Sequence, residues 1–582
     1  MSAAARWRGP RGLRGLHWRC AAPGLLLAGA AGALQSWAYV QPAAWPLPFA
    51  AIALLAWLVH GASVRRAAAL GWAFGGAWLL AATWWLFISL HRYGGLPAPL
   101  AVLAVLALCA ALSLYLAGAM AWVAQRRSGR PLHDASRFAA AWLAAELARA
   151  VWFTGFPWAA TGYSQVDGPL ALLAPWLGGY GLGALVAWVA AGLALGVGAL
   201  GRVRRGAGGG AGGGAGVGTG LGSVDSTGLQ ASVLPAVVRR SAVLALTLAV
   251  GLLVSSAGWT IWCGAPDFTQ PSQPSGASLR VALLQTNVAQ DEKFAAEHLP
   301  ASLAWVAQAL LAAQADLVLA PETAVPLLPE QLDELAPGYW SALQHHFSHP
   351  GGPAALVGVP LGSFEQGYTN SVVGLSSTSA AASGAVPAYR YDKFHLVPFG
   401  EFIPTGFRWF TTLMNIPLGD FNRGPINAPS FNVRGERVAP NICYEDLFGE
   451  ALALRFADAA TAPTILANVG NIGWFGNTIA VPQHLQISRL RSLELQRPML
   501  RATNTGATAV IDHRGRVTAQ LPPFTRAVLT GTVQGRQGLT PFARWSAAAG
   551  AWPLGALGPL WAIAALGLAW PVGWRVRRRA GQ

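Results

Sequence analysis

The stretch Ala439-Pro440-Asn441-Ile442-Cys443-Tyr444-Glu445-Asp446 lies where two kinds of local structure meet. Charged residues at alternate positions in the run Val433 to Ile442 predict a β-strand that ends before the cysteine. The apolar spacing from Leu447 to Phe456 predicts a helix after it. Cys443 is therefore expected at a strand-to-helix junction, where unpaired N–H groups and the positive end of the helix dipole favour a thiolate.

A lone cysteine is more often a buried structural residue than a nucleophile. Two other stretches favour the catalytic interpretation. An apolar strand from Leu317 leads to Glu322, and the stretch Tyr391 to Glu401 contains Lys393. A Glu, a Lys and a Cys, each just after a strand, form the set that acyl transfer through a thioester needs. Cys443 attacks a carbonyl, Glu322 takes and returns protons, and Lys393 stabilises the thiolate and the oxyanion.

Three motifs resemble the nitrilase superfamily and, more closely, the apolipoprotein N-acyltransferases of bacterial envelopes. They are Tyr-Asp-Lys-Phe-His-Leu-Val-Pro-Phe-Gly-Glu from Tyr391, Ile-Cys-Tyr-Glu from Ile442 and Asn-Ile-Gly-Trp-Phe-Gly from Asn471. The resemblance runs over nearly the whole chain. It implies a four-layer α-β-β-α sandwich with one active site and the catalytic triad Glu322, Lys393 and Cys443.

The resemblance also implies supporting residues around the triad. It gives Glu401 a role in orienting Lys393 or aiding proton transfer. It gives Tyr444 and Glu445, which flank the nucleophile, a role in activity, and backbone N–H groups there could help to form an oxyanion hole.

The substrate contacts are predicted from aromatic residues. We interpret Trp474 and Phe475 as lipid-facing or acyl-pocket residues, with simple core packing as the alternative. Phe294 follows Lys293 where the family usually has a Trp, so the ring is kept and its N–H is lost. Asn471 is followed by Ile472 where the family commonly has an acidic residue. Both departures concern the lipid or acceptor contacts rather than the triad.

The composition indicates a membrane protein of two or more domains. The 582 residues are 53% hydrophobic and only 11% charged, whereas a soluble domain is about one-quarter charged. The formal net charge is +16, but the Arg residues cluster between apolar spans, which indicates membrane topology rather than nucleic-acid binding. The four cysteines have no paired spacing, and no His pair has metal-ligand spacing, so neither a disulfide framework, a metal nor another cofactor is expected.

Eight apolar runs are long enough to cross a bilayer. They are roughly residues 22–40, 45–62, 67–90, 97–124, 136–154, 169–200, 241–263 and 551–574. Arg residues concentrate in alternate loops and in the C-terminal tail, while the other loops hold little beyond Arg92 and Asp167. The positive-inside rule therefore predicts that both termini lie in the cytoplasm of a bacterial inner-membrane protein, and that the large segment between spans seven and eight lies in the periplasm.

The character of the chain changes between Ser278 and about Gly538, where apolar strands and helical patterns alternate. This alternation predicts an α/β layered domain. The predicted domains are a membrane domain over residues 1–270 with about seven helices, a catalytic domain over 278–538, and a transmembrane helix with a basic tail over 546–582. Residues 206–222, mostly Gly and Ala, are predicted to be a flexible cytoplasmic linker.

Glu146 and Arg149 stand three residues apart within the fifth span. Charges inside a membrane are costly and are usually paired. A structural ion pair is the favoured interpretation, and contact with a phospholipid headgroup is the alternative.

By resemblance, the expected reaction moves an acyl chain from a membrane phospholipid, typically phosphatidylethanolamine, to the N-terminal amine of a diacylglyceryl-modified apolipoprotein. Two alternatives stay open. A membrane-tethered amidase would use the same triad with water as the acceptor. A transporter with an external binding module would need no triad at all.

Overall fold

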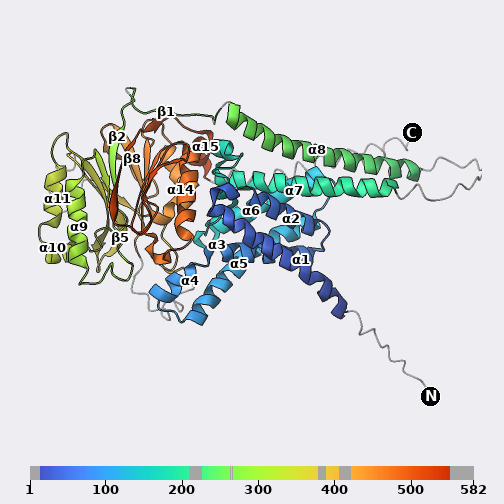
Figure 1. The fold of residues 1–582 in the computed structure, drawn as a ribbon, viewed down its shortest axis with the longest axis horizontal. Coiled ribbons are helices and arrows are strands. Elements are labelled where there is room, and N and C mark those ends of the chain that lie inside the picture. The colour runs from blue at the N-terminus through green and yellow to red at the C-terminus, as the bar shows by residue number, and fades with distance from the viewer. Residues whose placement is uncertain are drawn as a thin grey trace, which may run out of the picture.

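A computed structural model describes residues 14–208, 226–377, 389–404 and 421–550, apart from Cys263, Ala265 and Ser275. The predicted eighth span at 551–574, the basic tail and most of the Gly-rich linker lie outside the described residues. The described chain forms a bundle of long helices joined to a layered α/β domain (Figure 1).

The α/β domain contains two six-stranded sheets. The first has the order β13 (Ala527–Val533), β2 (Leu279–Gln285), β3 (Leu317–Leu319), β4 (Ala354–Ser363), β5 (Gly367–Leu375), β6 (Tyr389–Asp392). The second has the order β12 (Val517–Gln520), β11 (Ala509–Ile511), β10 (Met499–Thr503), β9 (Ile465–Gly470), β8 (Glu436–Ile442), β7 (Phe431–Val433). In each sheet three central strands are parallel, β2-β3-β4 and β8-β9-β10. Parallel strands are covered on both faces, which explains their nearly continuous apolar runs.

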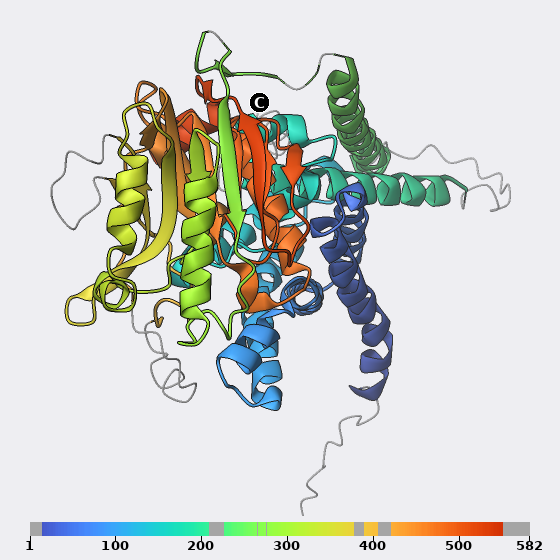
Figure 2. The same ribbon diagram turned by 60° about the vertical axis from the view of Figure 1, so that its left-hand side comes forward.

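Helices cover the outer face of each sheet. The first sheet packs against α9 (Leu299–Ala312), α10 (Pro329–Leu335) and α11 (Tyr339–Phe347). The second packs against α13 (Gly449–Ala453), α14 (Ala480–Leu495) and α15 (Pro541–Ala549). Apolar side chains from both sheets, such as the fully buried Leu319 and Val469, fill the space between them. The predicted α-β-β-α layers are confirmed, and Figures 1 and 2 show them from two directions.

The region around Cys443 differs from the prediction in two ways. The run Val433 to Ile442 is not one strand. It contains the last residue of β7, a tight turn at Arg434 (φ 49°) and Gly435 (φ 80°), and the antiparallel strand β8. After β8 the chain forms a short 3-10 helix, Cys443–Leu447, followed by α13 and a second 3-10 turn, Leu454–Phe456. No long helix therefore begins at the cysteine among these described residues.

The membrane domain contains α1 (Arg14–Gln35), α2 (Leu47–His60), α3 (Val64–Thr83), α4 (Leu86–Ile88), α5 (Ala98–Gln125), α6 (Pro131–Val151), α7 (Ala174–Gly208) and α8 (Ser226–Trp262). Four described segments are long and apolar enough to cross a membrane: Pro42–His60, Ala98–Gln125, Ala171–Arg202 and Ala236–Trp259. Val64–Thr83 and Leu86–Tyr93 make a fifth only as a pair bent by 63°. The predicted third span is thus a broken helix. The full number of crossings stays a prediction.

Glu146 and Arg149 in α6 are both buried and bind other parts of the protein. Glu146 Oε1 accepts hydrogen bonds from the backbone N–H and the hydroxyl of Thr161, at 2.7 and 2.8 Å. Arg149 Nη1 donates to the carbonyl oxygens of Phe156 and Trp158, at 2.9 and 2.6 Å. These contacts close the loop that follows α6, so the geometry supports the structural interpretation of this pair.

The two ends of the helix bundle have different contacts. At one end, Arg127 and Arg202 meet at His60, through the His60 carbonyl and ring. At the other end, Arg92 pairs with Asp291 at 2.7 Å, and Asp167 pairs with Arg489 at 2.6 Å, both across the joint with the α/β domain. The distal ends of α7 and α8 point away from the sheets in both views (Figures 1 and 2). The Arg-rich end of the bundle is therefore opposite the α/β domain.

Candidate active site

The three residues predicted to be catalytic follow strands from both sheets. Glu322 comes three residues after β3, Lys393 directly follows β6, and Cys443 directly follows β8. Lys393 Nζ donates to Glu322 Oε1 at 3.1 Å. Cys443 lies against Gly470, and the backbone N–H of the next residue, Asn471, donates to Glu322 Oε2 at 2.8 Å. The ends of the two sheets thus bring Glu322, Lys393 and Cys443 to one place.

The Glu322 carboxylate is fixed on both oxygens. Besides Lys393 and Asn471, it accepts a hydrogen bond from Asn370 Nδ2 at 2.7 Å. Burial alone would raise its pKa, but Lys393, the Asn370 amide and Lys293 act in the other direction, so the pKa lies below the usual 4.5. Glu322 is therefore a carboxylate at neutral pH.

Lys393 is fully buried between two carboxylates. Its Nζ donates to Glu401 Oε1 at 2.8 Å, and Glu401 is itself held by Asn370 Nδ2 and by the backbone N–H of Val397. Burial would lower the pKa of Lys393, but Glu322 and Glu401 outweigh it and raise the pKa above its usual value. The ammonium keeps its charge, and Glu401 contacts it directly. The role of Glu401 in orienting Lys393 or aiding proton transfer stays a prediction.

The expectation that local structure favours a Cys443 thiolate is wrong. Burial and the negative charge of Glu322 raise the pKa of Cys443 well above its ordinary value, and Lys393 and the backbone N–H of Asn471 offset only part of this. The five-residue 3-10 helix has no dipole to match that of a long α-helix. The raised pKa favours a thiol over a thiolate at Cys443.

Cys443 also has a strained backbone, with φ of 51°. Non-glycine residues rarely adopt this conformation, and the cases that persist concentrate at functional sites. Here the surroundings hold it, because the Cys443 carbonyl accepts from Asn468 Nδ2 at 3.2 Å and lies 3.2 Å from His484 Nε2. The strain turns the chain sharply at the point where the strand ends.

Glu445 connects the two segments that carry Lys393 and Cys443. Its Oε1 accepts from the backbone N–H groups of Phe394 and His395, at 2.7 and 3.2 Å. Its Oε2 accepts from the Tyr391 hydroxyl and from the backbone N–H of Ile442, both at 2.7 Å. A buried carboxylate with four such partners sets the distance between the lysine segment and the cysteine segment.

Tyr444 connects the nucleophile to the membrane domain. Its hydroxyl donates to the carbonyl of Gly155, in the loop after α6, at 3.0 Å. Gly155 has φ of 79°, and a Cβ there would lie 1.9 Å from the Ala150 carbonyl oxygen, so this close approach requires glycine. The position of Cys443 is thereby coupled to the end of a membrane-domain helix.

The aromatic residues predicted to bind substrate lie at or near the joint between the domains. Phe475 packs against Trp85 and Trp158, with ring centroids 4.2 and 6.3 Å apart. Trp474 makes an edge contact with Tyr93 at 5.6 Å. Phe294 is 52% exposed. Their contact with lipid stays a prediction.

The described residues hold no group of three or more His, Cys, Asp and Glu side chains placed to bind a metal. His484 instead contacts Asp446 Oδ1 at 2.9 Å, and Arg501 contacts Asp446 Oδ2 at 3.2 Å. His395 stacks on Phe448. These histidines and Arg501 brace the protein around the nucleophile. The absence of a metal or cofactor stays an expectation.

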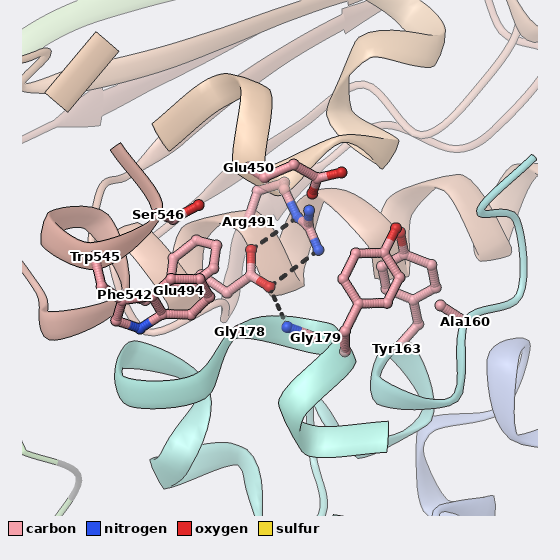
Figure 3. Close-up of a pocket in the computed structure, with 11 residues that line it drawn as sticks. Ala160, Tyr163, Gly178, Gly179, Glu450, Arg491, Glu494, Phe542, Trp545 and Ser546 are labelled. Atoms are coloured by element: carbon pink, nitrogen blue, oxygen red, sulfur yellow. Dashed lines mark hydrogen bonds and ion pairs between the residues drawn. The ribbon is translucent and has the colours of Figure 1, made fainter. Parts of the chain in front are cut away.

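A small cavity lies at the joint between α7, α13, α14 and α15, and it contains none of the three predicted catalytic residues (Figure 3). In it, Glu494 Oε1 accepts from Arg491 at 3.1 Å and from the backbone N–H of Gly179 at 2.5 Å. Burial raises the pKa of Glu494 to about 7, although Arg491 opposes the shift. This buried pair ties the start of α7 to the catalytic domain.

Sequence reasoning did not single out Asn370 as part of the site, and it named Lys293 only as the neighbour of Phe294, without a role at the carboxylate. Asn370 lies within β5 and has no motif around it, but it joins Glu322 to Glu401. Lys293 donates to the carbonyl oxygen of Glu322 at 3.0 Å. One compositional signal could have found Lys293, because Lys293 and Lys393 are the only two lysines in the chain.

Comparison with known families matches two regions of the chain. Residues 31–192 match the apolipoprotein N-acyltransferase N-terminal domain, and residues 280–541 match the carbon-nitrogen hydrolase family. The chain is 49% identical to the apolipoprotein N-acyltransferase of Verminephrobacter eiseniae over 547 residues, which covers 92% of each chain. It is 42% identical to the Ralstonia nicotianae protein of the same name over 531 residues, 90% of each chain. Among solved structures, a Helicobacter pylori carbon-nitrogen hydrolase aligns with a TM-score of 0.32 and 15% identity over 44% of this chain and 89% of that chain.

Proposed function

Because the chain belongs to the apolipoprotein N-acyltransferase family and is a membrane enzyme that N-acylates lipoproteins, we propose that it works through a thioester on Cys443. Glu322 is the proton acceptor, and Lys393 is the cation that stabilises negative charge. The observation that carries the proposal is the Glu322–Lys393 contact at 3.1 Å, beside the Cys443 thiol, whose pKa is raised by burial and by the Glu322 charge.

The first half-reaction loads the enzyme. The Cys443 sulfur attacks the ester carbonyl of a phospholipid, and Glu322 takes the thiol proton as the carbon–sulfur bond forms. Lys393 is placed to stabilise the negative charge that develops. The tetrahedral intermediate then loses the glycerol oxygen, which receives the proton from Glu322. The products are an acylated Cys443 and a lysophospholipid.

The second half-reaction transfers the acyl chain. The N-terminal amine of a diacylglyceryl-modified apolipoprotein attacks the thioester carbon, and Glu322 takes a proton from that amine. The sulfur leaves and regains a proton, which restores the thiol. The donor proposed here is phosphatidylethanolamine, and both lipid substrates would enter from the bilayer. The aromatic contacts at Trp474 and Phe475 support an entry near the joint between the domains.

Purified full-length enzyme incubated with phosphatidylethanolamine alone is expected to gain the mass of one acyl chain and to release one lysophospholipid per enzyme. Hydroxylamine should remove the added mass, because it cleaves thioesters. Intact-protein mass spectrometry and lipid analysis measure both products. Lysophospholipid that appears only after the acceptor is added, with no acylated protein beforehand, would contradict the thioester and indicate direct transfer.

We further propose that the catalytic domain lies on the periplasmic side and that both termini are cytoplasmic. Support comes from the Arg residues gathered at the end of the bundle opposite the α/β domain.

Alkaline phosphatase fused after residue 400 should therefore be active, and a fusion near residue 215 should be inactive, because the phosphatase folds only outside the cytoplasm. Phosphatase assays on cells with matched fusion levels would test this. The reverse pattern would overturn the orientation.

A further inference from the structure

Lysine is almost absent from this chain. Of its 40 Lys and Arg residues, only Lys293 and Lys393 are lysines. Both are buried, at 5% and 0% exposed, and both donate to Glu322, one to the main-chain oxygen and one to the carboxylate. An arginine stays charged at any physiological pH, while a lysine is compact and can lose its proton when buried. Two buried lysines that both contact Glu322, in a chain with no other lysine, indicate that positive charge is needed at this place.

Lys293 lies in the segment between β2 and α9, and its neighbours hold it at the site. Gln290 Oε1 accepts from Asn471 Nδ2 at 2.8 Å, which ties the segment to the residue that also binds Glu322. Asp291 pairs with Arg92 at 2.7 Å across the joint with the membrane domain. Lys293 Nζ makes one hydrogen bond to the described residues, at 3.0 Å, and an ammonium has three donors. Two donors are thus left for a reacting group.

The charged groups around the triad have a net negative charge without Lys293. Glu322 and Glu401 carry two negative charges and Lys393 carries one positive charge, so the three sum to −1. A tetrahedral intermediate adds an oxyanion to this buried site. Lys293 lies beside Glu322, whose charge acts on it, and a Cys443 thiolate formed during the reaction would act on it in the same way. A protonated Lys293 brings the sum of the resting charges to zero.

We propose that Lys293 is a second cation of the catalytic centre, a positioning residue that holds the main chain of Glu322 and whose positive charge stabilises the anion formed during acyl transfer. This inference rests on the proposed function of Cys443 and Glu322. If it holds, the full rate of Cys443 acylation depends on the positive charge of Lys293 as well as on its hydrogen bond.

The charge of Lys293 can be titrated. Burial lowers its pKa from 10.5 to about 8, and Glu322 and Cys443 only partly oppose the shift. The ammonium is therefore present below pH 8 and lost above it. The charge of Lys393 persists over the same range because its pKa is raised. A rate that depends on Lys293 should fall as the pH rises through about 8.

The test compares wild type with Lys293→Met in the first half-reaction, using purified full-length enzyme and phosphatidylethanolamine without acceptor. This excludes titration of the acceptor amine. At pH 7 we expect the variant to acylate Cys443 more slowly by about tenfold, less than the loss of a direct oxyanion donor. By pH 10 the ratio of the two rates should fall toward the part that the hydrogen bond to the Glu322 carbonyl alone contributes, because the wild-type lysine has then lost its charge.

The ratio separates the electrostatic role from a structural one. A neutral amine still donates a hydrogen bond to the Glu322 carbonyl, so a merely structural Lys293 would give the same ratio at pH 7 and pH 10. That result, or equal rates at pH 7, would overturn the proposal. If the wild-type enzyme forms no acylated Cys443, the proposed function and this inference both fail. The wild type is measured first, so this outcome is distinguished from a failure of the Lys293 proposal alone.

Two further variants control the experiment. Glu292→Gln removes a charge from the exposed neighbouring residue, and its rate ratio to wild type should not change with pH. Lys293→Arg retains a charge above pH 8, so its rate should hold where the wild-type rate falls. If the larger guanidinium does not fit the site, thermal unfolding will show it, and the ratio measured with Lys293→Met still decides the matter.

Discussion

Cys443→Ala is expected to form no acylated enzyme and to lower the rate of lipoprotein acylation by about 10⁴-fold or more, since the nucleophile of a covalent mechanism is removed. Cys443→Ser should lose nearly as much, because a hydroxyl releases its proton far less readily than a thiol. Burial and the charge of Glu322, which raise the pKa of the cysteine, would act on a serine hydroxyl in the same way. The measurements are single-turnover acylation by phosphatidylethanolamine and transfer to an acceptor lipopeptide.

Cys109→Ala is the matched control. Cys109 is also a free cysteine, but it is buried in α5 of the membrane domain, where its sulfur lies 3.9 Å from the Thr83 hydroxyl. This variant should gain one acyl chain at the wild-type rate, and peptide mapping should place the chain on Cys443. Acylation of lipoproteins by Cys443→Ala at a near wild-type rate would show that the acyl chain moves directly from donor to acceptor.

The sequence predicted the parts of the site that depend on local pattern. Glu322, Lys393 and Cys443 each follow a strand, and the strands are readable from their apolar runs, so their convergence at the sheet ends could be expected. The layered fold and most of the long helices follow from the same periodicities. The turn at Arg434 and Gly435 was missed, because a hairpin with a two-residue turn continues the alternation of the strand that precedes it.

Properties that depend on contacts distant in the sequence could not be predicted. Asn370 belongs to a strand without a motif, and its role appears only when β5 places it between Glu322 and Glu401. The pKa of Cys443 was expected to fall, and it rises instead, because burial by the folded protein outweighs the local helix. Phe475 contacts Trp85 of the membrane domain, which lies far earlier in the sequence.

The two carboxylates beside Lys393 should differ sharply in their effect on the rate. Glu322 accepts from the backbone N–H of Asn471, the residue that also acts on the Cys443 sulfur, whereas Glu401 accepts from the backbone N–H of Val397. We therefore expect Glu322, rather than Glu401, to exchange a proton with the sulfur. Both carboxylates keep Lys393 charged, but only Glu322 is proposed to take part in the proton transfer.

Glu322→Gln should lower the rate of Cys443 acylation by about 10²- to 10⁴-fold, because an amide cannot accept the thiol proton. Glu401→Gln should lower the rate of Cys443 acylation by only about tenfold, since the amide oxygen of the glutamine can still accept hydrogen bonds from Lys393 and Asn370. Glu330→Gln, at an exposed position of α10, should change nothing. Single-turnover acylation at pH 7 measures all three, with thermal unfolding as a check on folding. If Glu401→Gln lost as much as Glu322→Gln, the proton would be exchanged through Glu401, and the role assigned to Glu322 would be wrong.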